Sequence, residues 1–372
     1  MRIGVPTEIK ANEYRVGLTP SSVAELRKHG HSVVVQAGAG AGIHASDEAY
    51  RNAGAKIESA VERVFESCEL LVKVKEPQPI ECLRLRQDQV LFTYLHLAAN
   101  KPLALDLMRS GATAIAYETV SADDGSLPLL APMSEVAGRL SVQAGAYALQ
   151  REHGGAGILL GGVPGVPAAR VVVIGGGVVG TNASQIALGM RANVTVLDRS
   201  IGRLRELDAL FDGRIETIYA TSEAVEYHVR TADLVIGAVL IPGAAAPKLV
   251  SAELVGSMRP GAVLVDVAID QGGCFATSRA TTHADPTFIL DGVVHYCVAN
   301  MPGAVPHTAT YALNNATLPY VLDIADKGVI RALTENPHLG RGLNIYNGHI
   351  THKTVADALG IECSTIDFSR AA

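Results

Sequence analysis

Three glycines in the segment 171–180, VVVIGGGVVG, have the spacing of a nucleotide-binding turn. Gly175, Gly177 and Gly180 form a G-x-G-x-x-G pattern after an apolar run and before the helical pattern TNASQIALGM. Such glycines allow a tight turn, a close approach of the backbone to a pyrophosphate, and close packing of helix on strand. The N–H groups at the start of the following helix attract phosphates. The segment therefore predicts a dinucleotide site, and a glycine-rich turn that binds nothing is the alternative.

An acidic residue at the end of the next apolar run indicates which dinucleotide is bound. Asp198 ends the run ANVTVLD, 18 residues after Gly180. A carboxylate at this place can accept hydrogen bonds from ribose hydroxyls and repels a 2′-phosphate. Arg199 and Arg203 follow closely and could accept that phosphate, so NADP is the alternative. The pattern favours NAD.

A histidine interrupts the apolar segment FTYLHLAAN at 92–100. Taken alone, His96 is typical of a hydrogen-bonded core residue. Ligands of open α/β sheets, however, bind beyond the carboxyl ends of the strands, and His96 follows a strand predicted at 89–95. An imidazole there could take up the proton that oxidation of an amine or alcohol by NAD releases. We therefore predict a catalytic His96, with the core histidine as the alternative.

Three further polar residues could act on the same substrate. Asp270 follows a strand predicted at 262–269 and could orient the imidazole or act on a water molecule. The alternative, a loop carboxylate that caps a turn, agrees equally well with the sequence. Arg15 precedes the first predicted helix, where a guanidinium could clamp a carboxylate through two parallel hydrogen bonds. A surface arginine is the usual alternative. Lys75 follows a strand predicted at 70–74, and its alternative is a solvated edge lysine.

Alternating strands and helices must position these residues. We predict strands at 32–36, 70–74, 89–95, 113–117, 169–175, 192–198, 232–239, 262–269 and 294–300. We predict helices at 19–30, with Thr19 as N-cap, at 132–155, starting near Ser134, after Pro306, and near 351–359. This order indicates an α/β fold of two Rossmann-like domains with parallel sheets and an active-site cleft between them. We expect a discontinuous substrate domain, 1–128 plus 307–372, and an NAD-binding domain, 129–306.

Length and composition exclude several functional classes. A chain of 372 residues exceeds the size of one hydrophobic core. Its net charge of −6 and the absence of a Lys/Arg block argue against a nucleic-acid partner. The opening MRIGVPTEIK lacks a signal sequence, and no apolar run is long enough for a membrane span, so we expect no membrane partner and a cytoplasmic location. The five cysteines lack metal-ligand spacing, so we expect reduced thiols and no metal site.

With these residues laid out, the chain resembles the family of L-alanine dehydrogenases and pyridine nucleotide transhydrogenases over nearly its full length. The N-terminal block IGVPTEIKANEYRVGLTP and the glycine loop are shared by both groups. The blocks LFTYLHLAAN and LVDVAIDQGGC favour the alanine dehydrogenases.

The resemblance implies roles for individual residues. It makes Arg15 and Lys75 the holders of the substrate carboxylate, and His96 and Asp270 the catalytic pair. Two positions depart from the family pattern: Arg203 stands where lysine is common, and Ala220 stands where a hydroxyl is expected near the adenine. Besides the glycines, the residues that it places around the cofactor are Ser134, Val178, Asp198, Arg203, Leu240, Arg279, Val298, Asn300 and Met301.

The activity implied by the resemblance is reversible NAD-dependent oxidative deamination of L-alanine to pyruvate and ammonium. Two alternatives stay open: a dehydrogenase of another small amino or oxo acid, and a transhydrogenase-type module that binds NAD(H) and passes hydride to a second cofactor. The resemblance also implies a homohexamer, which the sequence alone does not fix.

Overall fold

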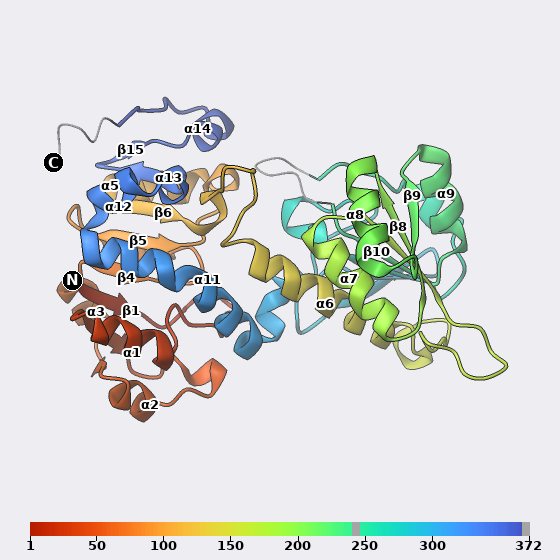
Figure 1. Ribbon diagram of the computed structural model, residues 1–372, viewed down its shortest axis with the longest axis horizontal. Helices are drawn as coiled ribbons and strands as arrows, with labels where there is room; N and C mark the ends of the chain where they lie inside the picture. Colours follow the sequence, from red (N-terminus) through yellow and green to blue (C-terminus); the bar gives the residue numbers. More distant parts are fainter. Residues whose placement is uncertain (240–245, 367–372) are drawn as a thin grey trace. The chain divides into compact units, whose positions relative to one another are not determined.

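The computed structural model describes residues 1–239 and 246–366, and these form two compact α/β units. The first unit combines Met1–Met133 with Val305–Ala372, and the second is Ser134–Ala304. Figure 1 shows a sheet with its helices in each unit. The predicted α/β architecture is confirmed. Within the described residues, no helix has the length and apolar character that crossing a bilayer requires.

The first unit contains an eight-stranded sheet with the order β15-β14-β6-β5-β4-β1-β2-β3. Six strands are parallel: β1 (Arg2–Val5), β2 (Ser32–Gln36), β3 (Lys56–Glu58), β4 (Leu70–Val72), β5 (Val90–Thr93) and β6 (Thr113–Ala116). The other two are antiparallel at one edge: β14 (Leu343–Tyr346) and β15 (His349–Ile350).

Nine α-helices and three 3-10 turns complete the first unit over its described residues. The α-helices are α1 (Pro20–Lys28), α2 (Asp47–Asn52), α3 (Val61–Ser67), α4 (Pro79–Cys82), α5 (Lys101–Ser110), α11 (Pro306–Lys327), α12 (Val329–Glu335), α13 (Pro337–Arg341) and α14 (Lys353–Leu359). The 3-10 turns are η1 (Ala41–Ile43), η2 (Leu97–Ala99) and η3 (Tyr117–Thr119).

Helix α1 begins as its sequence predicts. The side chain of Thr19 accepts a hydrogen bond from the Ser22 N–H, and Pro20 takes the first helical position. The C-terminal tail lies against this helix, because the Asn314 side chain on α11 accepts a hydrogen bond from the Thr19 N–H at 2.8 Å. Figure 1 shows α11 running across the first sheet beside α1. The last 68 residues thus return to the unit that the first 133 began.

The second unit contains a seven-stranded sheet with the order β12-β13-β11-β10-β7-β8-β9. All pairs are parallel except β12 with β13. The strands are β7 (Arg170–Ile174), β8 (Asn193–Asp198), β9 (Glu216–Tyr219), β10 (Leu234–Gly237), β11 (Val263–Asp266), β12 (Thr287–Leu290) and β13 (Val293–Tyr296). The helices are α6 (Ala131–Ala148), α7 (Val178–Gly189), α8 (Ile201–Phe211), α9 (Ser222–Thr231) and α10 (Ala252–Gly256), with 3-10 turns η4 (Arg151–His153), η5 (Val267–Gln271) and η6 (Met301–Ala304).

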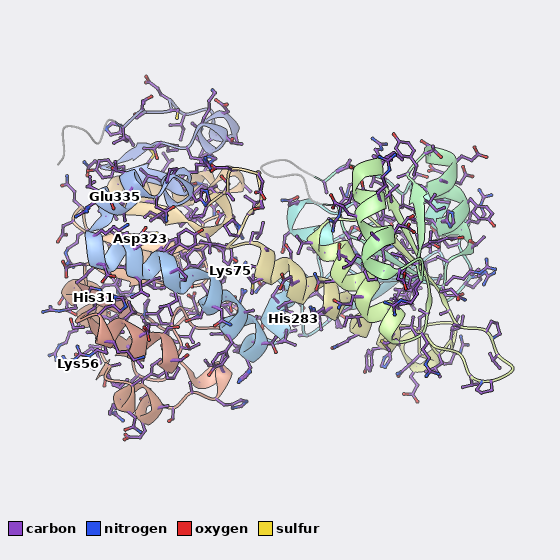
Figure 2. All side chains as sticks on the ribbon, in the orientation of Figure 1. His31, Lys56, Lys75, His283, Asp323 and Glu335 are labelled. Atoms are coloured by element: carbon purple, nitrogen blue, oxygen red, sulfur yellow. The ribbon has the colours of Figure 1, made fainter. Side chains whose placement is uncertain are left out.

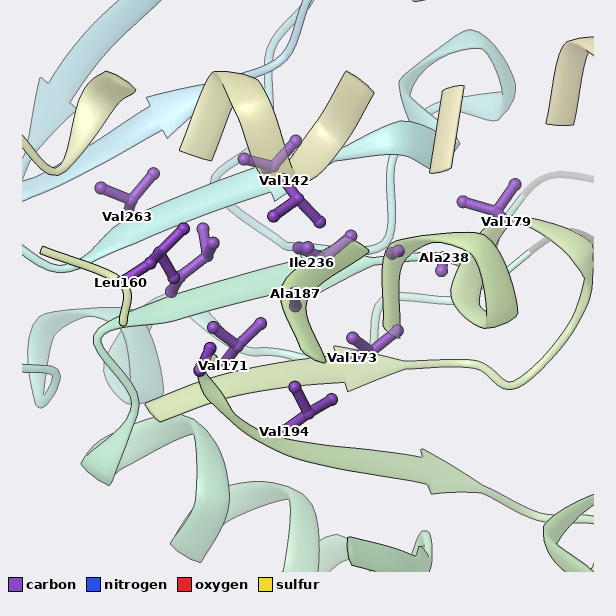
Figure 3. Close-up of a cluster of buried hydrophobic side chains, with 14 of the residues drawn as sticks. Val142, Leu160, Val171, Val173, Val179, Ala187, Val194, Ile236, Ala238 and Val263 are labelled. Carbon is purple, nitrogen blue, oxygen red and sulfur yellow. The ribbon is translucent and has the colours of Figure 1, made fainter. Parts of the chain in front are cut away.

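Small apolar residues let helices lie close to both faces of this sheet. Figure 3 shows Val171 and Val173 of β7 and Ile236 of β10 in one cluster with Val142 of α6 and Ala187 of α7. The intervening strand residues pack into a second cluster on the opposite face. A sheet buried on both faces requires continuous apolar strands, which is why these runs were recognisable in the sequence.

The structure corrects several predicted boundaries. Helix α6 begins at Ala131, so Ser134 is its fourth residue rather than its start, and it ends at Ala148 instead of 155. Strands β4, β5 and β11 end two to three residues before the predicted ends. Six strands were not predicted: β1, β3, β9, β12, β14 and β15. Strand β9 has four residues and β3 has three, and both include polar and half-exposed positions. Neither strand therefore forms an apolar run.

Candidate active site

The glycine loop of the second unit follows β7 and is held by contacts that only glycine allows. Gly175 has a φ of +102°, and a Cβ on it would lie 2.7 Å from the Ala238 carbonyl oxygen. A Cβ on Gly180 would lie 1.8 Å from the Gly175 carbonyl oxygen. These two glycines therefore let the loop fold tightly onto the first turn of α7.

Gly177 differs from its neighbours because space surrounds it. It is the N-cap of α7, and no heavy atom of the described ranges lies within 4 Å of a Cβ built on it. The first N–H groups of this 12-residue helix lack partners within the helix, and no side chain caps them. Val178, the first residue of the helix, is exposed at the same place. This arrangement fits a pyrophosphate.

Asp198 at the end of β8 holds the same loop. Its carboxylate accepts hydrogen bonds from the Gly176 N–H at 2.7 Å and from the Ser200 N–H at 2.8 Å. A carboxylate can accept about four hydrogen bonds, so Asp198 has the capacity to receive ribose hydroxyls as well. The predicted dinucleotide loop and its acidic residue thus lie together.

Arg203 braces the loop as well. Its guanidinium donates from Nε to the Gly176 carbonyl oxygen at 2.6 Å and from Nη2 to the Thr181 hydroxyl at 2.7 Å. It also pairs through Nη1 with Glu206 at 2.5 Å. These contacts use three of the five guanidinium N–H donors, so Arg203 braces the loop.

The remaining predicted cofactor residues have different surroundings. Ser134 is half-buried on α6, and Arg279 lies 4.1 Å above the ring of Phe288. Val298 and Met301 are buried in the core of the second unit, so their side chains point into that core. Leu240 lies outside the described residues.

Asp270 lies on the turn η5 and is exposed. The prediction that it directly follows a strand is wrong, because β11 ends four residues earlier at Asp266. Its two carboxylate oxygens accept the Asn300 N–H at 3.2 and 3.3 Å. Asn300 has a φ of +57°, so this contact joins Asp270 to a constrained backbone. Two of the predicted site residues are thereby brought together.

Asp266, which our sequence analysis did not single out, ends β11 and shapes the loop that carries Asp270. Its buried carboxylate accepts the Cys274 N–H at 2.9 Å, the Ala268 N–H at 3.1 Å and the Ser278 hydroxyl at 2.5 Å. Buried carboxylates need such partners. An acidic residue inside the apolar run AVLVDVAI was the available signal.

His96 in the first unit is not a core histidine. Its side chain is 44% exposed and its backbone is left-handed, with φ 52° and ψ 37°. The strand β5 ends at Thr93, two residues before the predicted end, and His96 precedes the turn η2. The imidazole lies 5.8 Å from the ring of Tyr94, measured between centroids. The exposed position leaves the ring available to a substrate.

Glu118 is the neighbour of His96 that our sequence analysis missed. It follows β6, and its carboxylate accepts the His96 N–H at 2.6 Å, while its Oε1 lies 3.5 Å from the imidazole Nδ1. The rule that led to His96, a polar residue beyond a strand end, would also have found Glu118 had it been applied to the predicted strand 113–117.

Arg15 is buried, with 2% of its surface exposed, so the interpretation as a surface arginine is wrong. Its Nε and Nη2 donate to the two carboxylate oxygens of Glu13 at 2.7 and 2.5 Å, and Nη1 donates to the Met133 sulfur at 3.0 Å. Burial raises the pKa of Glu13, but the hydrogen bonds and charge of Arg15 outweigh it and lower this pKa to about 2. The pair is therefore ionised at neutral pH.

Lys75 is 8% exposed, so it is not a solvated edge lysine either. Because β4 ends at Val72, both Lys73 and Lys75 lie beyond the strand, although Lys73 falls within the strand predicted at 70–74. Figure 2 labels Lys75 in the first unit. Its charge helps to lower the pKa of Glu13.

A buried ion cluster fixes the segment that carries Lys75. The Lys73 ammonium donates to Glu8 at 3.1 Å and to Glu81 at 2.8 Å, and all three side chains are buried. The other oxygen of Glu8 accepts the Val74 N–H at 2.6 Å. Lys73 is thus engaged in a structural ion cluster.

The ring of the buried Tyr94 lies beside the imidazole of His96. Burial raises the pKa of its hydroxyl, while the charge of Arg15 opposes that increase and the charge of Glu118 adds to it. Its hydroxyl donates to the Leu129 carbonyl oxygen at 2.6 Å. Arg15, Lys75 and His96 all belong to the first unit. Asp270 belongs to the second unit, and its meeting with His96 stays a prediction.

No group of three or more His, Cys, Asp and Glu in the described part of the chain has the arrangement of a metal site. Helix α11 instead pairs Asp323 with Lys327 at 2.5 Å.

Comparisons with known proteins extend over the whole of this framework. Two family models match, the N-terminal domain of alanine dehydrogenase/PNT at residues 4–137 and its C-terminal domain at residues 141–353. An alanine dehydrogenase of Halomonas elongata is 59% identical over 97% of this chain and 98% of its own length. An alanine dehydrogenase of Mycobacterium tuberculosis is 57% identical over 97% of each chain.

Solved structures give the same relationship. A structure of an L-alanine dehydrogenase is 52% identical, with a TM-score of 0.94 over 97% of this chain and 99% of its own. A transhydrogenase from Sinorhizobium meliloti is 25% identical, with a TM-score of 0.81 over 95% of this chain and 99% of its own. The fold is shared with both groups, while the sequence is much more similar to the first.

Proposed function

Because the chain belongs to the alanine dehydrogenase/PNT family, we propose that it is an NAD-dependent L-alanine dehydrogenase. The reaction is L-alanine, NAD⁺ and water to pyruvate, ammonium, NADH and a proton, in either direction. The observation that carries the proposal is the exposed His96 beyond a strand end, in the same unit as the buried Arg15 and Lys75. This unit offers a proton carrier and two cations, as an amino or oxo acid requires.

Arg15 and Lys75 hold the substrate carboxylate in this proposal. Their charges are largely screened from water by burial, which strengthens their attraction for an anion. Glu13 holds the Arg15 guanidinium from one side and thereby fixes its plane. A substrate held in one orientation presents its Cα–H to a single position, and such alignment lowers the barrier by several kcal/mol.

His96 and Asp270 manage protons and water. His96 takes the proton of the water that attacks the imine carbon, and returns it in the reverse direction. Asp270 stabilises the carbinolamine and the positive charge on its nitrogen. The Asn300 N–H contacts the carboxylate of Asp270 at 3.2 Å and holds this side chain in place.

When bound, NAD⁺ would supply the hydride acceptor, and this redox chemistry belongs to the cofactor. The open space at Gly177 receives the pyrophosphate, and Asp198 receives the adenosine ribose hydroxyls. Ser134, Val178, Arg279 and the segment 298–301 are the further residues that we propose to contact the dinucleotide, and Leu240 is proposed from the sequence alone.

The test is a spectrophotometric assay of NADH oxidation in the presence of pyruvate and ammonium. We expect turnover with both compounds and none when either is omitted. Turnover only with a larger 2-oxo acid would favour another amino-acid dehydrogenase, and hydride transfer only to a second nucleotide would favour a transhydrogenase module.

Replacement of His96 separates catalysis from binding. We expect His96→Ala to abolish turnover while NADH binding, followed by fluorescence titration, stays within about twofold of the original protein, since the glycine loop lies in the other unit. A variant that keeps more than about one tenth of the activity would remove His96 from the mechanism.

We further propose a cytoplasmic homohexamer. The family resemblance supports the hexamer. The five cysteines, all within the described ranges, are free thiols, which are typical of proteins in a reducing compartment. Light scattering after gel filtration tests the assembly, for which we expect about six times the chain mass of 38.9 kDa.

A further inference from the structure

The backbone of His96 is strained, and something must hold it. Its left-handed conformation, φ 52° and ψ 37°, is one that residues with a side chain seldom adopt. Such conformations persist where the surrounding structure fixes them, and they are frequent at functional sites. His96 is exposed, so core packing does not supply the restraint.

Glu118 supplies contacts to both the backbone and the ring. Its Oε1 accepts the His96 N–H at 2.6 Å, and both oxygens accept the Leu95 N–H at 3.2 Å. The same Oε1 lies 3.5 Å from the imidazole Nδ1. The Glu118 side chain is only 17% exposed, so water weakens these charged contacts less than it would at the surface.

The fold fixes Glu118 in turn. Strands β5 and β6 are paired in parallel, with Thr93 opposite Ala116, so the residues that follow each strand emerge side by side. The turn η3 that carries Glu118 is anchored by Thr119, whose hydroxyl donates to the Ala116 carbonyl oxygen at 3.2 Å and accepts from the Asn344 amide on β14 at 2.7 Å. The strand pairing and these hydrogen bonds therefore fix the position of Glu118 next to His96.

From this geometry we propose that Glu118 is the positioning residue of the catalytic His96: it holds the histidine backbone in the left-handed conformation and faces the imidazole with a negative charge. The inference rests on the proposed function. When His96 takes the proton of the attacking water, the carboxylate stabilises the resulting imidazolium, while the proton stays on the ring. His352 is a second titratable neighbour, since the charge of Glu118 acts on it, but burial dominates and lowers the pKa of His352.

The test compares Glu118→Gln with the original protein in the reductive direction. Glutamine keeps an oxygen for the His96 N–H but loses the charge. We expect kcat to fall roughly 10- to 100-fold, a part of what positioned acid–base catalysis contributes. The KM of pyruvate should stay within about twofold because Arg15 and Lys75 are unchanged. Activities are expressed per mole of bound NADH, which restricts the comparison to folded protein.

Isotope effects distinguish positioning from loss of structure. If proton transfer by His96 is impaired, the solvent isotope effect on kcat rises in the variant, while the effect of NADH deuterated at the transferred position does not rise. A fall in kcat with unchanged isotope effects, or a kcat within twofold of the original, would overturn the proposal. Glu118→Asp, whose carboxylate is withdrawn by one methylene, is measured in the same way if the glutamine variant does not fold.

Two controls separate this proposal from the function on which it rests. Glu62→Gln removes an exposed carboxylate of the same unit that pairs with Arg84, and it should leave kcat unchanged. If the original protein does not turn over pyruvate and ammonium, the proposed function fails. If it does so and His96→Ala is inactive, a normal Glu118→Gln variant refutes the positioning role alone.

Discussion

At the scale of single residues, the cations proposed to bind substrate differ in how they are held. Arg15 is held by its own neighbour Glu13 through two parallel hydrogen bonds. Lys75 is held through its backbone, because Glu8 accepts the N–H of Val74 and, at 3.4 Å, that of Lys75. The planar guanidinium thus has a fixed orientation, whereas the ammonium of Lys75 sits on a flexible stem.

Replacement of Arg15 by lysine tests whether orientation matters. Arg15→Lys keeps the charge but loses the planar fork, so one charge-assisted hydrogen bond to the substrate is lost. We expect the KM of pyruvate to rise roughly 10- to 100-fold, which corresponds to a bond of about 1.5–3 kcal/mol, with the dissociation constant of NADH unchanged. Steady-state kinetics and fluorescence titration give the two values. Arg109→Lys at an exposed helix position is the control, and an unaltered KM in Arg15→Lys would remove Arg15 from the substrate site.

At the scale of elements, a carboxylate holds the backbone after the strand end at each candidate position. Glu8 does so after β4, Glu118 after β5, Asp198 after β7 and Asp266 after β11. Parallel strands end with N–H groups that the ladder does not use, and a charged acceptor stabilises them where they are partly buried. In each sheet, the carboxyl ends of the strands therefore combine fixed loops with polar side chains.

The glycine loop gives a prediction in which neighbouring substitutions act differently. Gly177→Ala places a methyl group in open space, so we expect thermal stability within about 1 °C and NADH affinity lowered by roughly tenfold or more, because the methyl group occupies the path of the pyrophosphate. Gly180→Ala forces its Cβ onto the Gly175 carbonyl oxygen, so both stability and NADH binding should be lost. Thermal melts and fluorescence titration measure the two effects.

Gly189 provides the control for these substitutions. It ends α7, and no heavy atom of the described residues lies within 4 Å of a Cβ built on it. Gly189→Ala should raise stability by at most about 1 kcal/mol and leave NADH binding unchanged. Equal NADH affinities for Gly177→Ala and Gly189→Ala would contradict the assignment of the phosphate site.

At the scale of the whole molecule, the buried Glu13–Arg15 pair links folding to pH. The pKa of Glu13 falls from an ordinary value of 4.5 to about 2 in the folded protein. A lowered folded pKa means that the stabilisation is fully present above pH 4.5 and is lost as the pH falls towards 2. This shift of the Glu13 pKa corresponds to a contribution of about 3 kcal/mol to the free energy of unfolding at neutral pH.

The difference between the original protein and Glu13→Gln isolates this contribution. We expect the variant to be less stable at pH 7, because Arg15 loses its charged partner, and the difference in free energy of unfolding to shrink steadily below pH 4.5. Urea denaturation at pH 7, 5, 4 and 3 gives the values. A difference that stays constant across this range would show that Glu13 is not the group responsible.

Much of the fold followed from local patterns, and the errors have a common cause. The buried parallel strands were recognised because residues covered on both sides form continuous apolar runs. The strands β3 and β9 were missed because edge strands carry polar residues, and β14 was missed because its partner β6 lies more than 200 residues away in sequence. Strand ends were set too late because the apolar runs continue past the ends of β4, β5 and β11.

The amino-acid sequence by itself determined the two-domain α/β class, the family, and the glycine loop with its acid, because spacing along the chain is enough to specify a strand, a turn and a helix start. Only the tertiary structure decided that Arg15 and Lys75 are buried, that Lys73 belongs to an ion cluster, and that His96 is exposed beside Glu118. Burial and pairing depend on residues distant in the chain: Glu8 meets Lys73 across 65 positions and Glu118 meets His96 across 22. The local spacing of residues in the sequence does not specify such contacts, because they form only once the strands have paired.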